Sequence, residues 1–323
     1  MSRLGLVAAS PAASGGLPAQ REAACPSPRH EWASSHPLFP EGLSMLSQPV
    51  KRLNIIGNAD LLAEPMLAVV GARKATPYGQ SCAERFARRA ALAGVVVVSG
   101  GAIGCDQAAH RAALSAHGKT VVVLGCGADV VYPSRAKPLF DEVLATGGAL
   151  VSEAPWGSPP TRWGFKNRNR IIAGLGWATL IVEAGLPSGT FSTADATLEQ
   201  GKDVFVVPGS IDSRESRGSN RLLVQGAIPI VDYESFDDAL IATYGKQMRP
   251  LAAVALTSVE PELDAQSGTS PLVEACRACP VRAEELAGAL GIDLLQVIRM
   301  LSSLEIEGRV TRLRDGRYAA RAQ

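Results

Sequence analysis

The chain has 323 residues, a formal net charge of +1, 46% hydrophobic residues and 5% aromatic residues. This hydrophobic content excludes wholesale disorder, and the length suits one large α/β domain with a smaller unit, or two medium domains. Because the net charge is close to zero, an anionic partner has to be met by a local cluster of cations and not by the field of the whole surface.

Six cysteines lie in or beside apolar stretches, a pattern typical of buried free thiols in a reducing cytoplasm and not of a disulfide framework. No stretch approaches the ~18 apolar residues that a membrane helix needs. Both observations predict a cytoplasmic protein without membrane contact. Residues 1–36 are biased towards small residues and proline and carry no signal-peptide pattern, so we expect a disordered extension there.

Residues 37–245 alternate between short apolar segments that end in glycine or serine and helical patterns. The expected elements are the strand Leu67–Val70, the helix Tyr78–Ala93, the strand Val95–Val98, the helix Asp106–Ser115, the strands Thr120–Leu124, Leu150–Val151 and Thr179–Val182, the helix Thr190–Gln200 and the strand Val204–Val207. Such alternation predicts a Rossmann-like α/β domain whose parallel sheet is covered on both faces. Ligands of these sheets bind outside the carboxyl ends of the strands.

Residues 246–270 contain Pro, Ser, Gln and Gly without periodicity and are interpreted as a linker. Residues 271–323 then have the pattern of a small winged-helix domain. Its expected elements are the helices Val281–Leu290 and Leu294–Glu305 and a hairpin of Val310–Leu313 and Tyr318–Ala319. The second helix offers only Arg299 as a cation, so we do not expect sequence-specific reading of a duplex.

Two of the strand-end loops suit an anion. In the loop after Val70, Arg73 and Lys74 lie beside the start of a helix, although an ordinary turn with solvated cations explains them equally well. The loop that begins at Ser99 and Gly100 is rich in glycine but has neither the G-x-G-x-x-G dinucleotide pattern nor the G-K-[ST] of a Walker-type NTPase. The helix that follows carries Asp106, interpreted as its N-cap, and His110, interpreted as a hydrogen-bonded core histidine.

The segment from Trp163 to Ile172 is the most informative one. It places three cations and two amides beside an aromatic ring, namely Phe165, Lys166, Asn167, Arg168, Asn169 and Arg170. Guanidinium groups match phosphate oxygens, and a ring such as Phe165 can stack on a base. A solvated basic helix start would explain Lys166 but not the interleaved aromatic residues. We therefore favour a nucleic-acid site.

A further loop places Ser188, Gly189 and Thr190 at the start of a helix that also carries Thr193. Hydroxyl groups and free backbone N–H groups at such a position form a seat for an anion. Strand-end loops that each suit anions, gathered at one edge of one sheet, predict that the site binds a phosphate backbone.

A series of ordered motifs resembles the DNA-processing protein A family, also called DprA or Smf. The motifs are V-G-A-R-K at 70–74, S-G-G-A-I-G-C-D-Q-A-A-H at 99–110, G-C-G-A-D-V-V-Y-P at 125–133, R-N-R-I-I-A-G-L at 168–175, S-G-T at 188–190, V-P-G-S-I at 207–211, G-S-N-R-L-L at 218–223 and G-A at 226–227. The sequence departs from the family at Ile103, where arginine is usual, and at Lys166, where proline is usual.

The resemblance implies an extended Rossmann fold that binds single-stranded DNA, forms homodimers and loads the RecA recombinase during natural transformation or recombination. It implies a mediator that protects incoming DNA and carries out no bond chemistry, with no cofactor. The DNA site that we expect consists of Arg73, Lys74, Ser99, Gly100, Phe165, Lys166, Arg168, Asn169, Arg170, Ser188, Gly189, Thr190 and Thr193. Cys276 and Cys279 form a lone C-x-x-C without nearby histidines, so we expect no zinc site.

An enzyme is the main alternative. Related Rossmann proteins that cleave nucleoside monophosphates need a glutamate in the P-G-G-x-G-T-x-x-E motif, and Thr193 stands where that acid is required. Glu183 and Glu199 lie off the motif. A sensor of a small nucleotide derivative is a third possibility, and binding of oligo-dT compared with mononucleotides separates it from a DNA-binding protein.

Overall fold

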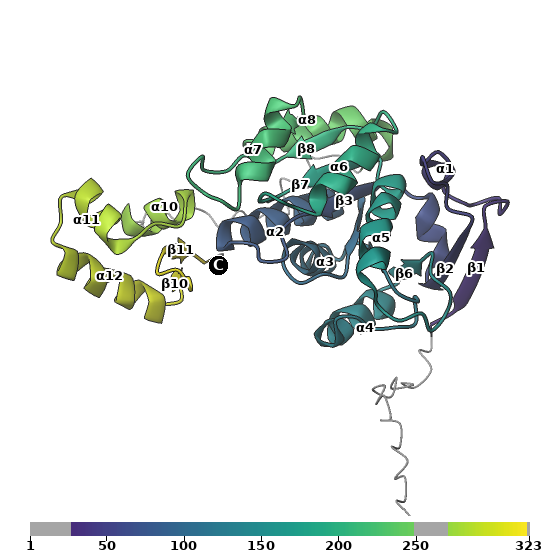
Figure 1. Cartoon of the computed structure of the whole chain (residues 1–323), viewed down its shortest axis with the longest axis horizontal. Coiled ribbons are helices and arrows are strands. Elements are labelled where there is room, and N and C mark those ends of the chain that lie inside the picture. Colours follow the sequence, from purple (N-terminus) through teal and green to yellow (C-terminus); the bar gives the residue numbers. More distant parts are fainter. Residues whose placement is uncertain (1–26, 249–270, 322–323) are drawn as a thin grey trace, which may run out of the picture.

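The computed structural model describes residues 27–248 and 271–321. These residues form a large α/β unit and a small C-terminal unit, and in Figure 1 the small unit and the strands β1 and β2 lie at opposite ends of the molecule. The strands of the large unit are β1 (Arg29–Ala33), β2 (Arg52–Gly57), β3 (Met66–Val70), β4 (Val96–Gly100), β5 (Thr120–Val123), β6 (Ala149–Ser152), β7 (Ala178–Ile181), β8 (Val204–Val206) and β9 (Ile228–Pro229).

The strands form one sheet in the order β1-β2-β6-β5-β4-β3-β7-β8-β9, and the neighbours from β6 to β9 are parallel. Strands β3 to β7 are buried along their whole length, because helices cover both faces and leave no room for alternating polar residues. The chain builds outwards from β3 to β6 and then returns to place β7 on the other side of β3. The reversal makes the carboxyl ends of β3, β4 and β7 the expected ligand site.

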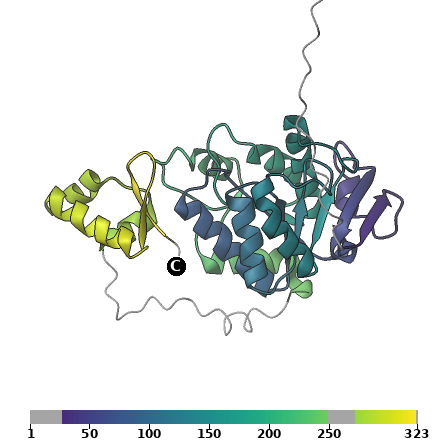
Figure 2. The ribbon, with the colours of Figure 1, turned by 90° about the horizontal axis from the view of Figure 1, so that it is seen from below.

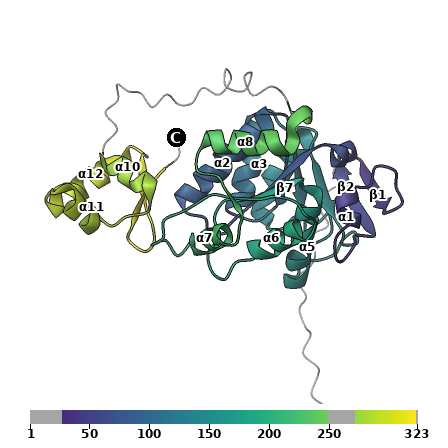
Figure 3. The same ribbon diagram turned by 90° about the horizontal axis from the view of Figure 1, so that it is seen from above.

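Two layers of helices enclose this sheet (Figures 2 and 3). One face is covered by α1 (Glu41–Ser44), α5 (Arg162–Leu175), α6 (Thr190–Leu198) and α7 (Arg217–Val224), and the other by α2 (Pro77–Leu92), α3 (Cys105–Ser115), α4 (Lys137–Ala145) and α8 (Tyr233–Tyr244). Short 3-10 helices lie at Ala59–Ala63 (η1), Ser134–Ala136 (η2) and Gly245–Gln247 (η3). The predicted α/β fold is thus confirmed, with helix ends displaced by one or two residues.

The amino-terminal part of the sheet corrects two expectations. Strand β1 pairs antiparallel with β2, so a disordered extension through residue 36 is wrong for residues 29–33, while residues 1–26 lie outside the described part of the chain. Strand β2 pairs antiparallel with β6, so the sheet is mixed. An edge strand that buries only Trp32 has no apolar run by which a sequence pattern could reveal it.

The C-terminal unit has the predicted winged-helix architecture. It consists of α10 (Pro271–Ala278), α11 (Ala283–Leu290), α12 (Leu294–Ile306), β10 (Val310–Arg312) and β11 (Tyr318–Ala320) around a core that includes Leu272, Cys276, Leu286, Val297, Leu301 and Val310. Helix α11 begins later than predicted because the backbone of Val281 pairs with that of Tyr318. Helix α10 was not predicted. Apart from η3, the expected linker 246–270 lies largely outside the described residues.

No single helix of the described chain has the length and apolar composition to cross a membrane, and only α11 and α12 taken together, bent by 117° where they meet, pass that test. The five described cysteines are free thiols. Three of them, Cys105, Cys126 and Cys276, are buried, as the sequence predicted for cysteines in apolar stretches.

Candidate nucleic-acid interface

Helix α5 begins at the carboxyl edge of the sheet. The side chain of Thr161 caps it by accepting a hydrogen bond from the N–H of Gly164 at 3.0 Å. The start of the helix lies against the loop that follows β5, where a Cβ on Gly164 would come within 2.2 Å of the Gly125 carbonyl oxygen. A Cβ on Gly125 would in turn lie 2.8 Å from the Phe165 ring. The two glycines therefore allow the contact that positions Phe165.

In this position, Phe165 lies in a row of three side chains with Arg73 and Tyr132. The guanidinium carbon of Arg73, in the loop after β3, lies 5.7 Å from the centroid of the Phe165 ring. The centroid of the Tyr132 ring lies 5.3 Å from that of Phe165, with the two planes inclined by 40°. A cation within ~6 Å of an aromatic face is attracted by the ring quadrupole. The structure thus joins Arg73 and Phe165, two residues that the sequence placed in different loops.

Exposed cations lie at this edge of the sheet. Arg73 and Lys74 of the loop after β3 are exposed, and so is Lys166 in the second turn of α5. Ile103, which replaces the arginine usual in the family, is 55% exposed and contributes no charge to the β4–α3 loop. An anion could therefore be met by cations from the β3 loop and from α5, but not from the loop between them.

Arg168 is placed differently from the expectation that it grips a phosphate. Its side chain is 5% exposed and points into the protein, where the guanidinium donates to the carbonyl oxygen of Val123 at the end of β5. A Cβ on Gly100 would overlap this guanidinium, so Gly100 is required for the close approach of β4. The Arg168 side chain is therefore a support beneath the site in this structure, and it does not belong to the surface.

Arg168 shares this buried position beneath the site with Asp106, Ser99 and His110, and we call these four residues the support layer. Burial raises the pKa of Asp106, whereas the positive charge of Arg168 acts to lower it. Asp106 is not the N-cap of α3, which corrects the expectation, because Gly104 occupies that position without a side-chain bond. The Ser99 hydroxyl donates to the Val69 carbonyl and ties β4 to β3.

His110 is the hydrogen-bonded core histidine that the sequence predicted. Its Nε2 lies 2.9 Å from the Gly100 carbonyl oxygen, and its Nδ1 lies 2.7 Å from the Thr120 hydroxyl. Because a carbonyl oxygen can only accept, Nε2 carries the proton of the neutral ring. The Thr120 hydroxyl also lies 2.7 Å from the Val97 carbonyl oxygen, to which it donates. Burial lowers the pKa of His110 to about 4, so the ring is neutral at pH 7.

The remaining polar residues of α5 hold other elements in place. Arg170 donates to the carboxylate of Glu153 after β6 and to the side chain of Asn167 at 3.0 Å. Its charge is neutralised there and is not presented at the surface. The amide of Asn169 donates to the Gly189 carbonyl at 3.1 Å and to the Ser192 hydroxyl at 2.9 Å, which ties α5 to the start of α6.

The start of α6 retains the features of an anion seat. Gly189 is its N-cap and is exposed, and the hydroxyls of Ser188 and Thr190 lie 2.7 Å apart. Thr190 and Thr193 are buried, so their side chains act in packing and in local hydrogen bonds. Of the residues expected in this loop, Ser188 and Gly189 are the ones that remain accessible.

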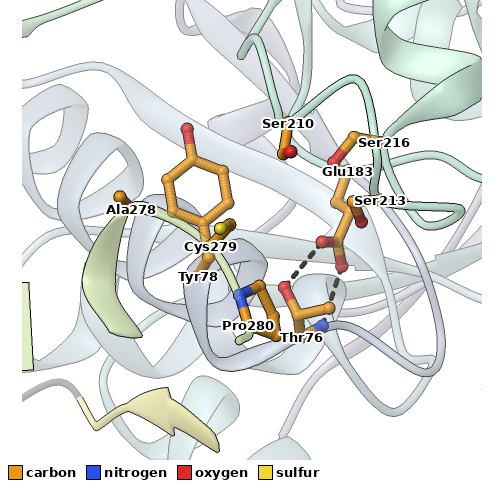
Figure 4. A pocket seen from close by; sticks show the side chains of 9 residues that line it. All are labelled: Thr76, Tyr78, Glu183, Ser210, Ser213, Ser216, Ala278, Cys279 and Pro280. Carbon is orange, nitrogen blue, oxygen red and sulfur yellow. Dashed lines mark hydrogen bonds between the residues drawn. The ribbon is translucent and has the colours of Figure 1, made fainter. Parts of the chain in front are cut away.

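Glu183, the acid considered for a nucleotide-cleaving enzyme, is engaged in the fold. Its carboxylate accepts from the N–H of Thr76 at 2.8 Å and from the Thr76 hydroxyl at 2.6 Å (Figure 4). Burial raises its pKa and these bonds oppose the rise. The bonds fasten the carboxyl end of β7 to the start of α2. The shallow pocket beside them is lined by Tyr78, Ser210, Ser213 and Ser216 and, from the small unit, by Ala278, Cys279 and Pro280.

The side chains of the described residues do not assemble a metal site. The described residues contain no cluster of three or more His, Cys, Asp or Glu side chains that could hold a metal ion. Cys276 lies in the core of the winged-helix unit, where burial raises the pKa of its thiol to about 11.

Two family models match this chain. Residues 31–241 match the model of DNA recombination-mediator protein A, and residues 257–316 match that of the DprA winged helix domain. The first match covers well over half of the sequence. The chain belongs to the DNA recombination-mediator protein A family. The second match begins inside the segment expected to be a linker.

Several relatives share long stretches with this family member. Protein Smf of Escherichia coli is 43% identical over 182 residues, which are 56% of this chain and 49% of Smf. The putative DNA processing protein DprA of Mycobacterium tuberculosis is 37% identical over 262 residues, 80% of this chain and 65% of the relative. The chain thus spans between one half and two thirds of the length of these relatives.

Two experimental structures share the fold. DNA processing protein A of Streptococcus pneumoniae superimposes with a TM-score of 0.60 at 36% identity, covering 67% of this chain and 74% of that one. DNA processing protein A of Helicobacter pylori, whose structure was described for its unique single-stranded DNA binding mode, also has a TM-score of 0.60, at 31% identity, covering 66% of this chain and 96% of that one.

Proposed function

We propose that this chain binds single-stranded DNA along the carboxyl edge of its parallel sheet and acts as a recombination mediator without bond chemistry. The observation that carries the proposal is the row of Arg73 and Phe165 beside the exposed cations Lys74 and Lys166. Cations that meet phosphates, next to a ring that can stack on a base, are the means by which proteins bind unpaired strands. The single-stranded DNA binding of the Helicobacter pylori relative supports the same function.

We assign the accessible residues to DNA and the buried ones to support. Arg73, Lys74 and Lys166 would contact phosphates, Ser188 and Gly189 would seat one phosphate at the start of α6, and Phe165 would stack on a base. Ser99, Gly100, Arg168, Asn169, Arg170, Thr190 and Thr193 would hold the loops that carry these contacts. A nucleotide-cleaving activity is disfavoured because Thr76 engages both oxygens of Glu183.

A salt titration tests the proposal. Binding of fluorescent oligo-dT should weaken steeply as salt rises, because neutralised phosphates release counterions. Arg73→Ala should reduce the logarithmic salt slope by about 0.7, the value for one phosphate contact to a single strand. Arg88→Ala, which removes an exposed arginine farther along α2, is the matched control and should leave the slope unchanged. A flat salt response of the wild type, or mononucleotide binding as tight as that of oligo-dT, would contradict the proposal.

We also propose the homodimer that the family resemblance implies, and we place its contact at the edge of the sheet. Strand β9 is one of the two edge strands. Exposed apolar residues lie on it at Ile228, two residues after it at Val231 and at the end of the preceding helix α7 at Val224. An apolar edge strand invites pairing with a second chain. Sedimentation analysis should find a dimer for the wild type and a monomer for Val224→Asp combined with Val231→Asp. A monomeric wild type would contradict this contact.

The loading of RecA onto DNA is proposed from the resemblance alone. In the reducing cytoplasm that the cysteines predict, the chain would receive an incoming strand, protect it and pass it to the recombinase. The test measures DNA-dependent ATP hydrolysis by RecA on strands covered with single-strand-binding protein, with and without this chain. An unchanged rate would contradict the loading role and would leave strand binding itself untouched.

A further inference from the structure

Tyr132 has no role in the site as described so far. It lies in the loop between β5 and η2, and its side chain is 45% exposed at the carboxyl edge of the sheet. The loop belongs to the motif at 125–133. Large aromatic side chains bury much apolar area when they pack, so an exposed ring beside a cationic row can offer that area to a ligand.

The ring of Tyr132 is held in a defined place. Its centroid lies 5.3 Å from that of Phe165, and the backbone of Gly125 packs against Phe165 from the same loop. Phe165 is only partly exposed and also lies beside Arg73, and Tyr132 is the more exposed of the two rings. A platform that is already ordered loses little conformational entropy when a ligand binds to it.

We propose that Tyr132 is a second base-stacking residue and that Tyr132 and Phe165 accept neighbouring bases of one strand whose phosphates meet Arg73. The inference rests on the proposed function and adds to it. Unpaired bases are the ligand of this chemistry, because the faces of bases in a duplex are covered by their neighbours. Every base has an aromatic face, so the stacking tolerates any sequence.

The test compares two strands of equal length and charge. One is oligo-dT and the other is an abasic deoxyribose-phosphate strand, and the affinities of the wild type, Tyr132→Ala and Tyr132→Phe are measured by fluorescence anisotropy at fixed salt. Tyr132→Ala should bind oligo-dT about tenfold more weakly and the abasic strand as the wild type does, because only stacking is lost. Tyr132→Phe should retain wild-type affinity.

Trp177→Ala is the matched control, since Trp177 is a partly exposed ring that stacks on Tyr244 at 5.8 Å, beside the amino-terminal end of β7. It should leave both affinities unchanged. If Tyr132→Ala and the wild type bound oligo-dT equally well, the stacking role of Tyr132 would be overturned, and the proposed binding of single-stranded DNA would remain. Equal weakening on both strands would also overturn the stacking role, since Tyr132 would then only hold its loop. A wild type that binds neither strand would overturn the proposed function itself.

Discussion

Helix α5 begins at the proposed DNA site, and helix α12 is the last helix of the winged-helix unit. The two helices differ in the side chains that they expose and in the layer on which they pack. Helix α5 exposes Lys166 and the 73% exposed Trp163, and beneath them it carries the buried Arg168. Helix α12 exposes Leu295 and Ile298 and packs on an apolar core. The difference is that α5, at the proposed DNA site, lies over a polar layer that fixes its loops, whereas α12 offers only Arg299 as a cation and packs on an apolar core.

The largest expected effect breaks the support under α5. Arg168→Ala removes the positive charge that acts on the buried Asp106, removes the donor to Val123 and leaves a cavity in place of a large buried side chain. The free energy of unfolding should therefore fall by about 3–5 kcal/mol. Urea denaturation measures it. Lys166→Ala on the exposed side of the same helix is the control and should change stability by less than about 0.5 kcal/mol.

The opposite result would remove this contrast between α5 and α12. If Arg168→Ala were as stable as the wild type and yet lost oligo-dT affinity with a smaller salt slope, Arg168 would contact DNA directly. The buried support layer would then not distinguish α5 from α12.

A second prediction concerns pH. Burial lowers the pKa of His110 to about 4, whereas histidine in the unfolded chain titrates near 6.5. Between these two pKa values the unfolded chain therefore binds more protons than the native chain. Stability therefore rises with pH across this window, and lowering the pH from 7 to 4 should cost about 3 kcal/mol through this group. Denaturation at a series of pH values measures the slope. His110→Gln should lack this part of it, and an unchanged slope would mean that His110 is not the group responsible.

The smallest expected effect concerns the winged-helix unit. Deletion from Ser270 onward should change the affinity for oligo-dT by less than about threefold, roughly 0.6 kcal/mol, because α12 offers only Arg299 as a cation. The salt slope of the truncated chain in the same anisotropy assay checks this. A loss of nearly all binding would place the main DNA contact in the winged-helix unit and reverse the comparison.

The sequence by itself predicted the α/β fold and the edge of the sheet at which we propose the DNA site. The apolar strands that end in glycine or serine predicted the parallel layers, because a strand buried on both faces has few other possible compositions. The same pattern predicted the loops of Arg73, Ser99 and Ser188, and the helix–helix–hairpin order predicted the winged-helix unit. Strand β1 was not predicted, because a strand with a single buried residue has no recognisable apolar pattern.

Only the tertiary structure decided which cations face solvent. Arg168, Asn169 and Arg170 read as one basic cluster, but successive residues of a helix are rotated by about 100°, so they point to different neighbours. Arg168 donates to Val123 and its charge acts on Asp106, Arg170 pairs with Glu153, and Lys166 remains exposed. Tyr132 joins the row with Phe165 through a contact between loops that are distant in sequence, and no local pattern records such a contact.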